Sequence, residues 1–168
     1  MPDTAEYLAR IQSYSDIENF LELQATTADA LRNVTANASS ATLQKSPAPG
    51  KWSIVAIVAH MAEDELVSSW RYRQMIENSG CALAGFDQDL WAKLGRYEAW
   101  AIDDALQMFT LLREANLRML KSLSKGDWER HGMHAERGKI TVRDLARHMA
   151  GHDRNHLEQI RKILAQSL

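Results

Sequence analysis

The chain lacks the cysteines and the long apolar runs that other classes of protein depend on. It has 168 residues but one cysteine, Cys81, which cannot form an intrachain disulfide. Packing must therefore stabilise the fold, and a reducing compartment suits this composition. The longest uninterrupted apolar stretch, residues 54–59, is far shorter than the roughly 20 residues of a membrane-spanning helix. The first residues show neither a basic region nor an apolar stretch, so we predict no signal peptide, no membrane partner and a cytoplasmic location.

An excess of charge of one sign is also missing. Twenty lysines and arginines nearly balance 22 aspartates and glutamates, which leaves a formal net charge of −2. Non-specific nucleic-acid binding requires a basic face, so we expect no nucleic-acid partner. A composition of 45% apolar and 25% charged residues is typical of a folded globular protein. The length predicts a single domain over residues 1–168.

Prolines and glycines are few, and they gather in three breaks that separate helical patterns. These breaks cover residues 46–51, 78–95 and 125–138. Between them, apolar residues recur at helical spacing. We expect long helices over residues 16–38, 53–78, 103–123 and 141–166, with short helices near 4–14 and 87–94. Ser53 is the expected N-cap of the second long helix, and Thr141 with Asp144 the expected capping box of the last. No alternation of apolar and polar residues is long enough to predict a strand. The fold class that follows is all-α, an antiparallel four-helix bundle.

Histidines carry the strongest chemical signal. Five of the six lie in the last 38 residues. His152 and His156 are four residues apart, so they share one helical face, and they interrupt its apolar stripe. His148 is spaced equally from His152, so spacing alone leaves two ligand pairs open. With His60 on an earlier helix, these imidazoles predict a three-histidine metal site with open positions, whereas the alternative is hydrogen-bonded core histidines.

Acidic and basic side chains accompany His60 on its helix. A rotation of 100° per residue places Asp64 and Arg71 on the face of His60, and favours Asp64 or Glu63 over Glu65 as the acid nearest the site. Asp64 or Glu63 would act as a proton acceptor. Arg71 would bind an anionic substrate, or else pair with one of these acids.

Two segments resemble a known family. The stretch Pro47-Ala48-Pro49-Gly50-Lys51-Trp52-Ser53 ends seven residues before His60, and His152-Asp153-Arg154-Asn155-His156-Leu157-Glu158-Gln159-Ile160 follows near the C-terminus. Both are similar to motifs of the DinB/YfiT-like superfamily of metal-dependent enzymes. The Asp-Trp-Glu and Gly-Met-His segments at 127–129 and 132–134 also sit as in that family. The resemblance runs from about residue 14 to the C-terminus.

The resemblance implies a four-helix bundle that holds one divalent metal, zinc or nickel, through His60, His152 and His156. It favours the pair His152 and His156, because the His-Asp-x-x-His motif matches those positions and not 148–152. It matches Glu65 to the family's acid five residues after the first histidine. Family members include S-transferases that use bacillithiol, mycothiol or glutathione, and a mycothiol-dependent isomerase.

The function predicted from this resemblance is a metal-dependent thiol S-transferase acting on small electrophiles. Its cofactor would be a low-molecular-weight thiol, which Arg71 would bind. The alternatives are a metal-dependent hydrolase or isomerase of a small molecule, and a non-catalytic stress-related binding bundle. The expected partners are a small-molecule substrate and a second copy of the chain in a homodimer. His134 is either a general acid or base at the edge of the metal cleft or a solvated loop residue.

Overall fold

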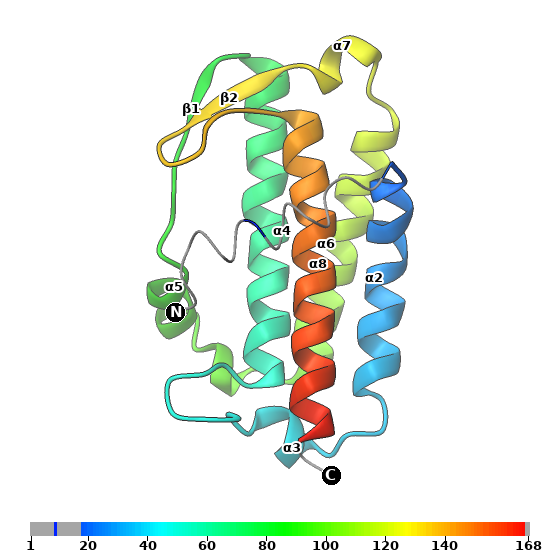
Figure 1. Ribbon diagram of the computed structural model, residues 1–168, viewed down its shortest axis with the longest axis vertical. Helices are drawn as coiled ribbons and strands as arrows, with labels where there is room; N and C mark the ends of the chain where they lie inside the picture. Colours follow the sequence, from blue (N-terminus) through cyan, green and yellow to red (C-terminus); the bar gives the residue numbers. More distant parts are fainter. Residues whose placement is uncertain (1–8, 10–17, 167–168) are drawn as a thin grey trace.

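The computed structural model describes residue 9 and residues 18–166. Four long helices form the molecule's main body (Figure 1). They are α2 (Phe20–Thr35), α4 (Ile54–Glu77), α6 (Ile102–Lys121) and α8 (Val142–Ala165). The four-helix bundle predicted from the sequence is therefore confirmed. The short helix expected near residues 4–14 falls, apart from residue 9, outside the described residues.

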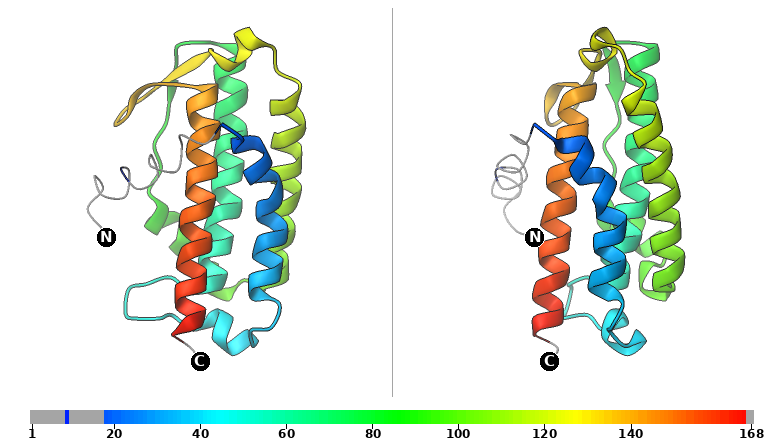
Figure 2. Two further views of the ribbon diagram at one scale, coloured as in Figure 1. Left: turned by 45° about the vertical axis from the view of Figure 1, so that its right-hand side comes forward. Right: turned by 90° about the vertical axis from the view of Figure 1, so that its right-hand side faces the viewer.

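The connections decide which helices run antiparallel. The segment between α4 and α6 returns the chain to the end of the bundle where α4 began (Figures 1 and 2). It contains the strand β1 (Cys81–Leu83), the helix α5 (Gln88–Leu94) and the 3-10 helix η1 (Tyr97–Ala99). As a result, α4 and α6 run in the same direction, whereas α4 and α8 pack antiparallel. The histidine-bearing helices are thus antiparallel neighbours.

Both histidine-bearing helices begin at the capping residues that the sequence predicts. Ser53 precedes α4, and its hydroxyl accepts a hydrogen bond from the backbone N–H of Ala56. Thr141 precedes α8 and forms a capping box with Asp144, in which each side chain accepts from the other residue's N–H. These bonds satisfy backbone donors that have no partner within the helix.

A small three-stranded sheet lies at one end of the mostly helical bundle, where the sequence predicted no strand. Strand β1 pairs in parallel with β2 (His131–His134), which pairs antiparallel with β3 (Gly138–Thr141). The strands have three or four residues each, too few for an alternating pattern to be visible in the sequence. Two further short helices, α3 (Ser40–Gln44) and α7 (Lys125–Trp128), lie in the connections.

Buried polar residues separate two apolar clusters along the bundle. The first cluster is built around the first half of α4 and the C-terminal part of α8, and includes Ile57 and Ile160. The second is built around the end of α4 and the start of α8, and includes Tyr72 and Leu145. Between the clusters, α4 and α8 bury carboxylates and imidazoles, as described below. No helix among residues 18–166 combines the length and the apolar character needed to cross a membrane.

Candidate metal centre

Three imidazoles converge in the interior of the bundle. His60 comes from α4, and His152 and His156 come from successive turns of α8. The Nε2 atom of His152 lies 3.1 Å from Nε2 of His60 and 3.1 Å from Nε2 of His156. All three side chains are buried, and their donor atoms lie within 4.8 Å of one another. The three histidines predicted from the sequence are thus brought to one point, which we call the histidine centre.

The chemistry of these contacts fits a shared cation. A ring nitrogen carries either one hydrogen or one lone pair, so Nε2 of His152 can complete only one of its two contacts as a hydrogen bond. A metal ion that accepts three lone pairs resolves this conflict. Two nitrogens bound to one tetrahedral zinc at 2.0–2.1 Å lie about 3.3 Å apart, close to the separation observed here.

The surroundings keep the histidines in the form that binds metal. Burial, followed by the neighbouring His156, lowers the pKa of both His60 and His152 well below the usual range. Neutral imidazole is the metal-binding form. The amide oxygen of Gln159 lies 2.9 Å from Nδ1 of His156, and since that oxygen only accepts, Nδ1 donates and the lone pair is left on Nε2.

Asp64 is the acidic residue that contacts the histidine centre. Its Oδ2 atom lies 3.4 Å from Nε2 of His152. The carboxylate does not belong to the group of ligand atoms that all lie within 4.8 Å of one another among the described residues. Burial, and secondly the charge of Glu65, raises the pKa of Asp64 to about 7. A carboxyl group with this pKa exchanges a proton readily near neutral pH.

The other two acids of this segment have different partners. The Oε2 atom of Glu63 accepts a hydrogen bond from the hydroxyl of Tyr97, which lies in η1. Glu65 is buried, and its two carboxylate oxygens accept hydrogen bonds from Arg113 and Asn116 of α6. The structure therefore selects Asp64 from the two acids that the helical wheel favoured.

A buried ionic network adjoins the histidine centre, and the sequence reasoning missed it. Arg113 donates from Nη1 and Nη2 to the carboxylate of Asp153, at 2.6 and 2.9 Å, and from Nη2 to Glu65 at 2.9 Å. Thr27 of α2 also donates to Asp153 at 2.8 Å. Burial alone would lower the pKa of Arg113, but the two carboxylates outweigh it and raise that pKa. The available signal was a polar residue in the apolar stripe of residues 103–123.

The network fixes the helices that carry the metal ligands. Asp153 directly follows His152, and Glu65 lies one helical turn beyond His60 on α4. Arg113 joins both carboxylates from α6, while Thr27 holds Asp153 from α2. All four long helices are thereby tied together at the level of the histidine centre. A buried ion pair of this kind adds little stability compared with an apolar pair, but the loss of one partner is costly because it leaves a buried charge unpaired.

Arg71 extends the polar interior toward the sheet. Its Nη2 atom donates a hydrogen bond of 2.6 Å to the carbonyl of Ala84, and its guanidinium lies 5.9 Å from the centre of the Phe86 ring. Among the described residues, Arg71 forms no ion pair with Asp64 or Glu63, although the charge of Asp64 acts on it. His134 is buried at the end of β2 rather than solvated in a loop.

His148 lies beside the histidine centre without joining it. Its ring centre is 6.3 Å from that of His152, whereas the rings of His152 and His156 are 4.4 Å apart. Trp52, which precedes α4, packs against His60 with ring centres 4.9 Å apart. Cys81 lies in β1 as a half-buried free thiol.

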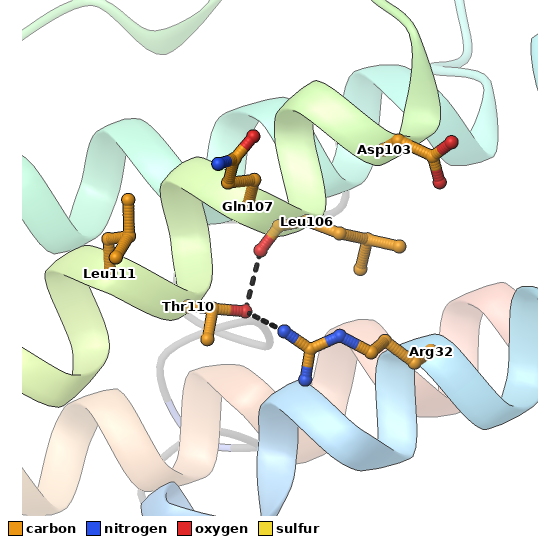
Figure 3. Close-up of a pocket in the computed structure, with 6 residues that line it drawn as sticks. All are labelled: Arg32, Asp103, Leu106, Gln107, Thr110 and Leu111. Atoms are coloured by element: carbon orange, nitrogen blue, oxygen red, sulfur yellow. Dashed lines mark hydrogen bonds between the residues drawn. The ribbon is translucent and has the colours of Figure 1, made fainter.

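A groove between α2 and α6 lies away from the histidine centre. It has a volume of about 320 Å³ (Figure 3). There the Thr110 hydroxyl accepts a hydrogen bond from Arg32 and donates one to the carbonyl of Leu106 (Figure 3). None of its lining residues belongs to the histidine centre or to the ionic network. We therefore place the functional site at the histidines.

The fold and the site define a helical bundle with a buried three-histidine centre between antiparallel helices. The model of the DinB superfamily matches residues 23–160, so the chain belongs to this superfamily. The comparison with known families thus confirms the resemblance noted in the sequence.

Relatives and a solved structure agree with this assignment. A protein of Oceanobacillus iheyensis named "Putative metal-dependent hydrolase OB0782" is 25% identical over 133 residues, covering 79% of this chain and 77% of that relative. A second protein of that organism with the same designation, OB0413, is 22% identical over 152 residues, covering 90% and 87%. The structure of YfiT from Bacillus subtilis, described as a probable metal-dependent hydrolase with an unusual four-helix bundle topology, superposes with a TM-score of 0.83. Its sequence is 16% identical, and the match covers 89% of this chain and 86% of that one.

Proposed function

We propose that the protein is a metal-dependent hydrolase of a small molecule. The observation that carries this proposal is the convergence of three buried Nε2 atoms beside one carboxylate, Asp64. His60, His152 and His156 would hold one divalent ion, zinc or nickel. Three protein ligands leave a coordination position for a reactant, as in catalytic rather than structural zinc sites. The relatives that are named as hydrolases support the same reaction class.

A metal at this centre would supply Lewis acidity, which lowers the pKa of a bound water or thiol and polarises a substrate carbonyl. The chain's own residues would manage the protons and the geometry. Asp64, with a pKa near 7, would accept the proton of the attacking water and return it to the leaving group. Trp52 would hold His60 in place by ring packing and shield it from bulk water.

Sulfur transfer is the second candidate at the same centre. A thiol would take the place of water, Asp64 would accept the thiol proton, and the sulfur would attack an electrophilic carbon and displace a leaving group. The observation that favours this candidate is the presence of arginines and histidines next to the centre, described below. Glutathione and bacillithiol, two of the thiols implied by the sequence resemblance, carry carboxylates that would suit these side chains.

Metal analysis and a reaction panel test the proposal together. The protein is purified without a metal-affinity step, and its zinc and nickel contents are measured by mass spectrometry. We expect close to one equivalent per chain, and less than a tenth of that in His60→Ala or His152→Ala. His131→Ala is the matched control, because His131 is half-exposed in β2 and bonds to Ser79, away from the centre.

The panel separates the two reactions. Small esters, amides and lactones report hydrolysis, while monochlorobimane with glutathione or bacillithiol reports sulfur transfer. Metal-dependent turnover of the first group without thiol supports the hydrolase, and turnover that requires thiol supports the transferase. A metal-loaded protein that turns over neither group, or a protein that binds neither metal in calorimetry, would overturn the proposed function.

A further inference from the structure

Four basic side chains gather between the histidine centre and the sheet, and the proposed reaction does not use them. They are Arg71 of α4, His134 of β2, Arg137 of the turn between β2 and β3, and His148 of α8. We call this group the basic cluster. The small sheet, which the sequence analysis did not predict, supplies two of its four members.

Backbone pairing places Arg71 beside His134. The guanidinium of Arg71 donates its 2.6 Å hydrogen bond to Ala84, the residue that follows β1. The last residue of β1, Leu83, pairs directly with His134 in β2. Both Arg71 and His134 are nine-tenths buried. A guanidinium and an imidazole are therefore held close to the sheet edge that faces α4.

His148 and Arg137 complete the basic cluster from the opposite side. His148 lies one helical turn before His152, with ring centres 6.3 Å apart, so it points toward the sheet end of the same polar interior. Burial lowers the pKa of His148 to about 3, and the charges of Arg137 and Arg71 act in the same direction. Both arginines also act on His134. The four side chains thus lie within electrostatic reach of one another.

The permanent charges of this group are its two guanidinium groups. Two guanidinium groups repel each other here, since each opposes the charge of the other. The carboxylates that offset the basic cluster are Asp64, which acts on Arg71, and Glu136, which acts on His134. Two guanidinium groups that repel each other favour an anionic ligand beside them, because its charge offsets the repulsion.

We infer that the basic cluster is a subsite for a carboxylate, and that the small molecule bound at the histidine centre carries this group. Along the helices, four residues separate His148 from His152 and seven separate Arg71 from Asp64, which corresponds to about 6 and 10 Å at 1.5 Å per residue. The carboxylate would therefore lie several bonds from the reacting group. The position of that reacting group rests on the proposed function, whereas binding of the carboxylate does not.

Arginine is suited to this role at the position observed. A guanidinium has five N–H donors and binds a carboxylate through two parallel hydrogen bonds. The bond to Ala84 and the nearby Phe86 ring fix the orientation of Arg71 before any ligand arrives. Little side-chain entropy is then lost on binding, which strengthens recognition.

Calorimetry with matched probes tests the inference. N-acetylalanine carries the carboxylate, and N-acetylalaninamide is its uncharged counterpart. We expect the carboxylate to bind at least tenfold more tightly than the amide, to the protein as purified and after chelation. Arg71→Met should weaken carboxylate binding about ten- to hundredfold, the equivalent of a lost charge-assisted hydrogen bond. Arg73→Gln is the control, because Arg73 lies two residues away on the same helix, is exposed, and bonds to Ser69.

A second variant covers the case in which Arg71→Met does not fold. If Arg71→Met loses its cooperative thermal transition, carboxylate binding is measured in Arg137→Gln instead, since Arg137 is half-exposed in a turn and its replacement should not disturb folding. Its expected loss is smaller, about two- to tenfold, because solvent screens that position. Equal binding of both probes, or carboxylate binding that neither variant weakens, would overturn the inference.

Further probes distinguish the source of the carboxylate. If it belongs to a thiol cosubstrate, N-acetylcysteine should bind the metal-loaded protein more tightly than N-acetylalanine. If it belongs to the hydrolysed substrate, the two should bind alike; both results support the subsite. N-acetylcysteamine has the thiol without the carboxylate. If it binds as tightly as N-acetylcysteine, the carboxylate subsite is contradicted. Metal binding is measured separately. Carboxylate binding by a protein that takes up neither zinc nor nickel would refute the proposed function alone, and metal binding without carboxylate binding would refute the subsite alone.

Discussion

Asp64 and His152 meet across the interface of α4 and α8, with Oδ2 of the carboxylate 3.4 Å from Nε2 of the imidazole. The same nitrogen faces His60 and His156 at 3.1 Å, so the carboxylate lies at the edge of the ligand group and not within it. An acid in this position is close enough to exchange a proton with a reactant at the histidines. The three imidazoles are then the side chains that could hold a metal ion.

This arrangement predicts that Asp64→Asn separates metal binding from turnover. The amide keeps the size of the side chain but cannot accept a proton. We expect the metal content to remain near one equivalent while kcat falls by about a hundredfold or more, the usual contribution of a general base. Glu63→Gln is the matched control and should lower kcat far less, since Glu63 is bonded to Tyr97. Loss of the metal in Asp64→Asn would show instead that Asp64 is a ligand.

The choice of ligand pair on α8 gives a second prediction. The Nε2 atom of His156 contacts Nε2 of His152. The ring centre of His148, in contrast, is 6.3 Å from the ring centre of His152. We expect His156→Ala to weaken zinc affinity by at least a hundredfold in competition titrations with a chelating dye. His148→Ala should retain one equivalent with at most a small loss of affinity. The opposite ranking would move the centre one turn along the helix.

The helices and the histidine centre were predictable from the sequence because their signals are local. Helical spacing and the caps at Ser53 and Thr141 predict helix starts that the structure confirms. The same periodicity placed His60 and His152 in the bundle interior. Spacing alone did not separate His148 from His156, and the family motif made that distinction.

The remaining features depend on contacts between distant segments. Strand β1 pairs with β2 across about 50 positions of sequence, and strands of three or four residues are too short for a sequence pattern to indicate that pairing. The partner of Glu65 is Arg113, 48 residues away, so no local pattern identifies it. Glu63 has its partner in Tyr97, which lies 34 residues further along the chain. The local sequence therefore could not show which of Asp64 and Glu63 faces the histidine centre.

The buried ionic network predicts that replacing its arginine lowers the unfolding free energy far more than replacing an exposed arginine does. Arg113→Met removes the only guanidinium bonded to Asp153 among residues 18–166, and it leaves two buried carboxylates without a cation. Such a loss costs about 3–5 kcal/mol of unfolding free energy. Urea denaturation of the metal-free protein measures it. Arg118→Met, which removes an exposed contact of 3.8 Å to Glu114, should change the value by less than about 1 kcal/mol. Equal effects of the two variants would contradict a stabilising role for the network.

The packing of the sheet gives the last prediction. Gly132 lies in β2 opposite Cys81, and a Cβ atom added there would come within 2.6 Å of both Cγ and Cδ1 of Leu83. Leu83 is 2% exposed, so its side chain has little room to move away. Gly132→Ala should therefore lower the unfolding free energy by about 1–3 kcal/mol, the usual cost of overpacking.

Gly126→Ala separates this steric cost from a general effect of replacing glycine. Gly126 lies in α7, and its added Cβ would meet only Ser124 Oγ, at an ordinary 3.8 Å. Alanine is favoured over glycine in a helix by about 0.5–1 kcal/mol, so this variant should be neutral or slightly more stable. Because Leu83 precedes Ala84, whose carbonyl accepts the hydrogen bond of Arg71, a shift of β1 in Gly132→Ala should also weaken carboxylate binding. Unchanged stability in Gly132→Ala would mean that β1 moves away from β2 without cost, and the sheet would then not be the rigid support that places His134 beside Arg71.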